Sequence, residues 1–431
     1  MTAIAPTRHF SARIGSALIV LSSAAFAQQP TLERFVFSGS DITYARGIDA
    51  QGRVVGSHSS TGGKHGYLRD ANGAMTTVDW PGASITSFEG MSEGGVAVAY
   101  VVGGAGIPGP AEYTNGGWSA LQALPFSTSF LQGANDAGVR VGYLVGTDAS
   151  HHGLLYVNDT PLVFDFPGAH ATELADVDAQ GRILGNYRPD DVSPWRGFLH
   201  DPLAGTWRDI ERPGFAEMRV RGMNDLGDIV GEVLPMGGGQ RRAALFSDGQ
   251  WSDLELFGVL GESRAADVAN DGRICGDYYG RFRGADAVLG FLLDPNGDGP
   301  ATFCDSTVNS SGSAAQIHFA GSTSIAANDL ELEAGPAPAN TPGVFFYGSS
   351  TTLTPFGDGF LCVGTPHQRV GPAPTDPSGF AWRPFDANEP HAALGPVTAG
   401  STWYFQYWFR DPAAGGAGFN TSRALEVEFT P

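Results

Sequence analysis

Residues 47–56, GIDAQGRVVG, recur five more times along the chain in degenerate form. The later copies read GMSEGGVAVA from Gly90, GANDAGVRVG from Gly133, DVDAQGRILG from Asp176, GMNDLGDIVG from Gly222 and DVANDGRICG from Asp267. Consecutive copies begin 43 to 46 residues apart. Self-similarity at a fixed period of this length is the sequence signature of a repeat architecture, and it outranks local motifs as evidence for the fold.

Each unit repeats the same order of turns and short apolar strands. In the first unit a turn at 49–52 precedes a strand at 53–56, and a second strand follows at 65–68. A third strand at 75–79 ends at a Pro-Gly corner, and a fourth at 84–88 leads into the next turn. Asn, Asp and Gly suit tight turns because they tolerate positive φ or bond back to the backbone. We therefore interpret the repeated acids as turn formers rather than glycosidase-type carboxylate pairs: Asp49, Asp136, Asp178, Asp225 and Asp271.

Four short strands in about 43 residues is the size of one β-propeller blade. The 61 glycines and 28 prolines argue against a helical repeat, which needs long runs at helical spacing. A right-handed β-helix is the second choice, since its coils are usually shorter. The sixth unit stops at 291–294 without a third strand, and residues 34–40 (RFVFSGS) match the missing piece. We expect an all-β chain with a six-bladed propeller, closed by the N-terminal strands so that two open sheet edges disappear.

The units resemble the HAF family of bacterial extracellular repeats. Its loose consensus is a G-I-N-D-x-G-x-V-V-G turn and strand, followed by a His-Ala-Phe strand. The first half matches well at Gly47, Gly133 and Gly222, whereas the second half is degenerate and comes closest at 65–67 (HGY) and 152–154 (HGL). The resemblance covers residues 34–295. It implies an exported repeat protein and brings no assigned catalytic residues.

The first 27 residues are typical of a secretory signal peptide. Arg8 and Arg13 form a basic end, residues 14–21 are a short apolar run, and 25–27 (AFA) fits a cleavage site. The run is too short to span a bilayer, and a retained N-terminal anchor is the alternative reading. We expect a protein that is secreted or held at the cell surface, with a propeller over 28–299.

The chain is strongly acidic, with a formal net charge of −20 that becomes −22 without Arg8 and Arg13. Repulsion from phosphate groups argues against DNA, RNA or an anionic membrane as a partner. Solubility of an exported protein is the simpler reason for this charge. We expect a monomer whose partner is an extracellular protein or a glycan.

The period is lost at about residue 300. Alternating apolar runs between Gly and Pro turns predict an antiparallel β-sandwich over residues 300–431. This segment is similar to a C-terminal domain that recurs in large secreted bacterial proteins and has no established activity. The similarity lies in Cys304 with 309–312 (NSSG), 327–330 (ANDL), 344–348 (VFFYG), 357–364 (GDGFLCVG) and 403–412 (WYFQYWFRDP).

The three cysteines divide into a pair and a single residue. Cys304 and Cys362 occupy recognisable positions in that C-terminal resemblance, and an oxidising compartment favours a bond between them. We predict that they form a disulfide. Cys275 stands where other units have Val55 and Val230, so we expect it to be a small buried apolar side chain.

The sharpest local motif is DPNGDG at 294–299. Asp294, Asn296 and Asp298 alternate before a glycine, as at the start of an EF-hand calcium loop, and Asp305 falls at the twelfth position. However, that position usually holds Glu, and no helix is expected on either side. We predict an interdomain turn without a metal, and calcium binding is the alternative.

No other motif carries chemistry. The sequence has no HExxH, no matched Cys/His cluster and no G-x-S-x-G, so we assign no catalytic, cofactor-binding or metal-binding residues and expect no cofactor. The aromatic run at 403–409 is interpreted as a central strand of the sandwich, and stacking on a sugar or protein is the alternative.

These observations predict an exported, non-catalytic binding or structural protein whose variable loops supply specificity. The alternative is a propeller hydrolase or lyase that acts on extracellular polysaccharide, because propellers support both kinds of function. A cluster of buried carboxylates or histidines outside the turns, at one mouth of the channel, would favour the enzyme.

Overall fold

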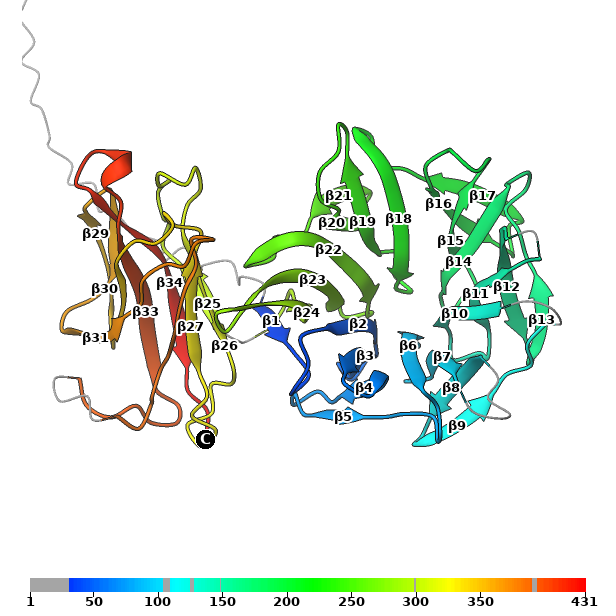
Figure 1. Cartoon of the computed structure of the whole chain (residues 1–431), viewed down its shortest axis with the longest axis horizontal. Helices are drawn as coiled ribbons and strands as arrows, with labels where there is room; N and C mark the ends of the chain where they lie inside the picture. Colours follow the sequence, from blue (N-terminus) through cyan, green and yellow to red (C-terminus); the bar gives the residue numbers. More distant parts are fainter. Residues whose placement is uncertain (1–30, 104–108, 125–127, 148, 298–299, 390–393) are drawn as a thin grey trace, which may run out of the picture.

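The computed structural model describes residues 31–103, 109–124, 128–147, 149–297, 300–389 and 394–431 (Figure 1). The signal-peptide prediction at 1–27 lies outside these residues. The described chain is all-β, as expected: it forms strands β1 to β34 and one short 3-10 helix, Pro412–Ala414. Across these ranges, no helix is long and apolar enough to cross a membrane.

The repeated part is built from groups of four antiparallel strands. The first three groups are β2 (Thr43–Ile48), β3 (Val54–Ser60), β4 (Gly63–Arg69), β5 (Met75–Thr77); β6 (Ile85–Met91), β7 (Ala97–Val102), β8 (Pro110–Thr114), β9 (Gly117–Ala120); and β10 (Thr128–Ala134), β11 (Arg140–Val145), β12 (His151–Val157), β13 (Thr160–Val163). The next two are β14 (Ala171–Val177), β15 (Ile183–Arg188), β16 (Arg196–Asp201), β17 (Thr206–Ile210); and β18 (Phe215–Met223), β19 (Ile229–Pro235), β20 (Arg242–Ser247), β21 (Gln250–Asp253).

The remaining group takes its fourth strand from the other end of the chain. It consists of β22 (Val259–Val268), β23 (Ile274–Phe282) and β24 (Ala285–Asp294), and β1 (Thr31–Phe35) pairs antiparallel with β24. The first strands β2, β6, β10, β14, β18 and β22 contact one another in this order, and β22 contacts β2 (Figure 1).

The first two groups depart from the expectation of separate sheets. A single parallel bridge between Lys64 and Ile85 joins them into one eight-stranded sheet. Gly63 permits this close approach, because a Cβ there would lie 2.7 Å from the carbonyl oxygen of Ser84.

The repeated motif forms a hairpin between the first and second strands of each group. In the first group a β-bulge between Ala45 and Gly47 precedes the turn. A Cβ on Gly47 would lie 2.5 Å from the backbone nitrogen of Met91, so the absence of a side chain lets two first strands come together. Gly52, at the end of the turn, has a φ of 78°, which glycine adopts without strain.

The C-terminal part contains two larger sheets and a hairpin. The five-stranded sheet has the order β25 (Ala301–Phe303), β34 (Phe419–Glu428), β33 (Thr402–Arg410), β28 (Gly343–Gly348), β31 (His367–Pro372). The three-stranded sheet has the order β26 (Gln316–Ala320), β27 (Glu331–Gly335), β32 (Ala381–Pro384), and the hairpin is β29 (Thr351–Phe356) with β30 (Gly359–Val363). One apolar core lies between the two larger sheets.

The aromatic run occupies the central strand of the five-stranded sheet, as interpreted from the sequence. β33 pairs with β34 on one side and β28 on the other. Trp403, Phe405, Tyr407 and Phe409 are buried in the shared core. Tyr404 and Trp408 lie on the opposite face and are half-buried. This strand is therefore a structural element rather than an exposed stacking surface.

The cysteine predictions are confirmed. Cys304 and Cys362 form a disulfide, with their Cα atoms 6.4 Å apart, and it ties the segment after β25 to β30. Cys275 is a free, fully buried thiol among apolar neighbours, and burial raises its pKa.

Side chains of β1 tie three parts of the chain together. The Arg34 guanidinium is fully buried and pairs with the buried Glu333 carboxylate on β27. Arg34 also donates hydrogen bonds to the carbonyl oxygens of Phe319 at 3.0 Å and Arg281 at 3.2 Å. The preceding residue, Glu33, pairs with the buried Arg69 on β4.

We expect Arg34→Ala to lower the free energy of unfolding by about 3–5 kcal/mol, because it leaves the Glu333 charge buried without its partner. Chemical denaturation monitored by tryptophan fluorescence measures the effect. Arg242→Ala, which removes an exposed partner of Asp253, is the control and should cost less than about 1 kcal/mol. The double variant Arg34→Met/Glu333→Leu should recover most of the loss. A double variant as unstable as Arg34→Ala would contradict this explanation.

The disulfide closes a loop with a sequence separation of 58 residues. Its removal in Cys304→Ala/Cys362→Ala should therefore cost about 4 kcal/mol in the chain-entropy description. Thermal unfolding without reductant measures the change. The parent protein in reductant should unfold like the double variant, and equal stability of parent and variant without reductant would contradict the prediction.

Candidate functional site

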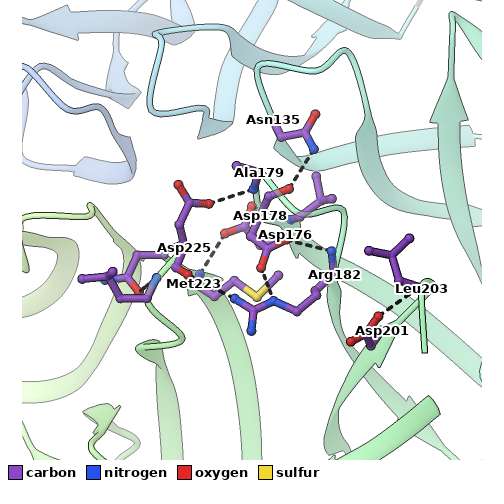
Figure 2. Close-up of polar contacts among 12 residues, drawn as sticks. Asn135, Asp176, Asp178, Ala179, Arg182, Asp201, Leu203, Met223 and Asp225 are labelled. Carbon is purple, nitrogen blue, oxygen red and sulfur yellow. Dashed lines mark hydrogen bonds and ion pairs between the residues drawn. The ribbon is translucent and has the colours of Figure 1, made fainter. Parts of the chain in front are cut away.

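At one end of the first strands, hydrogen bonds join the six turns of the repeated motif into a closed belt, and Figure 2 shows its links among the third, fourth and fifth turns. Asn135 Nδ2 donates to the carbonyl oxygen of Asp178 at 2.8 Å, and the backbone N–H of Ala179 donates to Asp225 Oδ1 at 2.8 Å. The remaining links are Asp225 N to Asn270 Oδ1, Arg273 Nη2 to the Ala50 oxygen, Ala50 N to the Glu93 oxygen, and Ser92 Oγ to Asp136 Oδ1.

The repeated turn acids perform two different tasks. Asp49 Oδ1 accepts hydrogen bonds from the backbone nitrogens of Gln51 at 3.0 Å and Arg53 at 2.8 Å, which agrees with the turn-forming role. Asp178 bonds in the same way to Arg182, and Asp271 to Arg273. Asp136 and Asp225 instead accept from the neighbouring turn. The role follows the position in the motif: Asp49 and Asp178 are its third residue, whereas Asp136 and Asp225 are its fourth.

Two further carboxylates lie inside this belt and are not turn residues. Asp176 and Asp267 stand at the first position of the motif, where four units have glycine. They are 9% and 7% exposed. Asp176 accepts hydrogen bonds from the backbone nitrogens of Val177 and Met223, both at 2.8 Å. Asp267 accepts from those of Val268 at 2.8 Å and Ile48 at 3.0 Å. Each carboxylate therefore links its own first strand to the next.

Buried carboxylates outside the turns are the feature that would favour an enzyme over a binding protein. The protonation and contacts of Asp176 and Asp267 therefore bear directly on the function. Burial raises the pKa of Asp267 to about 7, and burial together with the nearby Asp267 raises the pKa of Asp176 well above its usual range. Both oxygens of each group already accept backbone N–H bonds. The cavity that they line has a volume of about 50 Å³, which holds water molecules but not a sugar ring. We assign these residues a structural role.

In the first strands, one or three residues before the motif, lie charged residues that form a cluster of ion pairs with one another and with residues of β19 and β23. We call this cluster the charged ring. Arg46 pairs with Asp277 at 2.6 Å, and Arg264 pairs with the same carboxylate at 2.9 Å. Its members come from five of the six groups: Arg46, Glu89, Glu173, Arg219, Arg221, Glu232, Arg264 and Asp277.

The arginines of the charged ring lower the pKa values of two of its carboxyl groups, Glu232 and Glu173. Arg221 forms a two-pronged contact with Glu232, with N–O distances of 3.0 and 2.6 Å. Burial alone would raise the pKa of Glu232, but the charge and hydrogen bonds of Arg221 lower it to about 2. Glu173 pairs with Arg219 and also with His151 Nδ1 at 2.7 Å, and its pKa is lowered against the effect of burial. Such groups hold and orient a polar ligand better than they donate protons.

Beside the charged ring runs a series of half-buried rings that we call the aromatic row: Tyr100, Phe130, Tyr143, His151 and Trp195. Successive ring centroids are 4.6, 4.9, 4.9 and 6.3 Å apart. The row joins the charged ring directly, because His151 contacts Glu173 and the Arg219 guanidinium lies 4.6 Å from the Trp195 centroid. Burial raises the pKa of Tyr143 to about 12, so its hydroxyl remains protonated.

The charged ring and the aromatic row were not predicted, because their residues occupy positions at which the units differ. A signal was nevertheless present in the sequence: most first strands carry a charged residue either one or three residues before the motif. The histidines that recur in two units, His65 and His152, have a different role. His65 pairs with Asp79 at 2.7 Å and His152 with Asp165 at 2.8 Å, and in both units the contact joins neighbouring segments of the same group.

The predicted interdomain motif forms a turn where it is described. The backbone nitrogen of Asn296 donates to Asp294 Oδ1 at 2.8 Å, as in an Asx-turn. Asp298 lies outside the described residues. Asp305 is highly exposed and pairs with Arg423 at 3.6 Å. Among the residues that the structure covers, no three His, Cys, Asp or Glu side chains are grouped as metal ligands.

A larger cavity, of about 930 Å³, lies between the repeated and C-terminal parts. Phe257 and His318 line it and stack with centroids 4.3 Å apart. Burial lowers the pKa of His318 to about 3, so this imidazole is neutral. Two arginines that line the cavity form ion pairs: Arg242 with Asp253, and Arg423 with Asp305. The cavity thus combines neutral aromatic and paired charged groups at the junction.

No protein-family model and no curated protein sequence matches the chain. Solved structures with partial similarity include the putative TolB from Agrobacterium tumefaciens, at 13% identity and a TM-score of 0.42, over 53% of this chain and 89% of that one. SapL1 lectin in complex with alpha methyl fucoside gives 14% identity and a TM-score of 0.38, over 58% and 95%. Oligogalacturonate lyase from Vibrio parahaemolyticus gives 9% and 0.37, over 66% and 98%. Similarities at this level assign no function.

The raised pKa values of Asp176 and Asp267 make stability depend on pH. The folded chain keeps these carboxyls protonated above a pH of about 4, where the unfolded chain has released the protons. Because the folded state binds more protons, the free energy of unfolding falls as pH rises from about 4 to the folded pKa of about 7.

We therefore expect Asp176→Gly/Asp267→Gly, which installs the glycine of the other units, to reduce the loss of melting temperature between pH 5 and pH 8 by roughly 3 °C or more. Differential scanning calorimetry at both pH values measures it. Asp70→Asn, at an exposed turn, should retain the parent's dependence. An identical pH dependence in parent and double variant would rule out this assignment.

Proposed function

We propose that this protein is an exported, non-catalytic glycan-binding module. In this proposal residues 1–27 are a signal peptide, residues 28–299 form a six-bladed β-propeller closed by β1, and residues 300–431 form a β-sandwich. The cyclic contacts of the first strands and the closed belt of turns support the propeller. The pairing of β1 with β24 supports closure by the N-terminal strand. The HAF resemblance and the disulfide support export.

The observation that carries the binding proposal is the continuity of the aromatic row with the charged ring. Aromatic faces stack on the apolar faces of sugar rings, while charged groups at their edge hydrogen-bond to hydroxyls. The row runs from Tyr100 on β7 to Trp195 beside β16, so its rings come from three successive groups. A glycan that spans these groups would contact both the row and the charged ring.

Catalysis is the less favoured function. The ring carboxylates Glu173, Glu232 and Asp277 all pair with arginines, and Glu232 has a pKa of about 2. Because the pKa values of Glu173 and Glu232 are lowered, neither group is poised to donate a proton near neutral pH. The carboxylate oxygens of the buried Asp176 and Asp267 accept hydrogen bonds from backbone N–H groups. A hydrolase or lyase that acts on polysaccharide is therefore an outcome of the test.

The test is a glycan array with residues 28–431, combined with a screen for hydrolase and lyase turnover of every glycan that binds. We expect saturable binding without turnover. Tyr143→Ala and Trp195→Ala should each weaken it about tenfold, equivalent to about 1.4 kcal/mol. Trp382→Ala, at a 44% exposed tryptophan of the C-terminal part, is the matched control and should bind like the parent.

Two results would overturn the proposal. The first is turnover of a bound glycan that is lost in Glu173→Gln. The second is unchanged affinity in both the Tyr143 and the Trp195 variants.

A further inference from the structure

Lys64 is the only lysine in the chain, which carries 25 lysine and arginine residues in total. It lies on β4 and is bridged to Ile85, at the start of β6. Its ammonium group lies 5.5 Å from the centroid of the Tyr44 ring, and the Arg46 guanidinium lies 4.8 Å from the same ring. Lys64 therefore belongs to the face that carries the charged ring.

The charged ring is balanced, and Lys64 unbalances it. Four arginines face four carboxylates, and each carboxylate has an arginine within 4.0 Å. For Lys64, in contrast, no carboxylate of the described residues lies within 4.0 Å of the ammonium nitrogen. Burial lowers the pKa of this amine, with Glu89, Asp277, Arg46 and Arg264 close enough to influence it. The face thus has one positive charge that contacts an aromatic ring, with no carboxylate of the described residues in direct contact.

This cation is connected to the aromatic row through β6. Ser87 on that strand donates a hydrogen bond to Glu89 at 2.5 Å and lies opposite Tyr100, the first ring of the row. A ligand that extends from Lys64 along the row would therefore cross from the first group to the fourth, where Trp195 lies. An oligosaccharide with one anionic group at Lys64 and sugar rings beside the aromatic row fits this arrangement better than a small ion does.

The charge of the whole chain limits the kind of anion. A net charge of −20 repels polyanions with closely spaced phosphates or sulfates, whereas one carboxylate per sugar can be held by a single local cation. Lysine supplies a compact charge on a flexible stem, which suits contact with one carboxylate oxygen.

We propose that the face binds an acidic oligosaccharide, with a uronate carboxylate on Lys64 and adjoining sugar rings on the aromatic row. This inference rests on the proposed glycan binding and names its ligand class.

The test uses uronate trisaccharides, their methyl esters and the matched neutral trisaccharides, titrated into residues 28–431 by calorimetry. We expect the acids to bind at least tenfold more tightly than the esters at low salt, and to lose this advantage at high salt. Lys64→Gln should remove the preference for the acid and leave the affinity for the neutral trisaccharide within about twofold. Lys64→Arg should keep the preference, while Trp195→Ala should weaken acid and neutral ligands alike.

The single lysine allows a second measurement on the unmutated protein. Acetylation of amines removes the Lys64 charge, whereas reductive methylation keeps it. We expect acetylation to abolish the acid preference and methylation to retain it, and a bound acidic trisaccharide should slow both reactions at Lys64. Circular dichroism of each product checks that the fold is intact.

The failure of this inference can be told apart from failure of the proposed function. If neutral trisaccharides bind as tightly as the acids, and Trp195 is needed for this binding, the proposal of an acidic ligand is wrong and glycan binding stands. An acid preference that persists in Lys64→Gln would also overturn it. Absence of binding by every trisaccharide would overturn both.

Discussion

Arg34 carries a positive charge into an interface without access to water, and Glu333 makes that position tolerable. The pair, together with the carbonyl oxygens of Phe319 and Arg281, satisfies most of the guanidinium's donors. Desolvating two charges is expensive, so the net contribution of the pair to stability is small, whereas loss of either partner is costly. Its effect is therefore mainly on specificity: β1 is held in one register between the last group and the C-terminal part. The neighbouring Glu33 extends the same strand's contacts to Arg69 in the first group.

The two ends of the first strands are used differently because they meet different constraints. At the turn end the strands approach so closely that a side chain on Gly47 would overlap Met91, so polar groups there bond to the backbone and to one another. Asp176 and Asp267 fit because their carboxylates accept hydrogen bonds from backbone N–H groups of the next first strand. One or three residues before the motif, long side chains form ion pairs instead, such as Arg46 with Asp277 and Glu173 with Arg219. Polar groups that stabilise the fold thus lie at the turns, whereas polar groups that could bind a ligand lie farther back along the same strands.

Much of the architecture could be predicted from the period of the sequence. Turn residues and strand order follow from local physical chemistry, so a repeat seen six times averages out local ambiguity. The pairing of Cys304 with Cys362 and the burial of Cys275 followed from resemblance and position. The parallel bridge at Lys64 could not be predicted, because it depends on how closely two groups approach. The aromatic row and charged ring also remained hidden, since averaging over repeats discards the positions at which they differ. Asp267 shows the intermediate case: its departure from glycine was visible in the sequence, but its partner Ile48 lies on a strand whose proximity only the fold reveals.

The pairing of β1 with β24 has a consequence for the order of events during biosynthesis. β1 is among the first described segments to leave the ribosome, but its partner is complete only when Asp294 has been made. Until then the early groups can form local hairpins while the last sheet lacks its outer strand and Arg34 lacks Glu333. The contact is the most nonlocal in the sheets, and such pairings form slowly. Until then the facing edges of these two strands are unpaired, and a chaperone that binds the nascent protein would shield them at this stage.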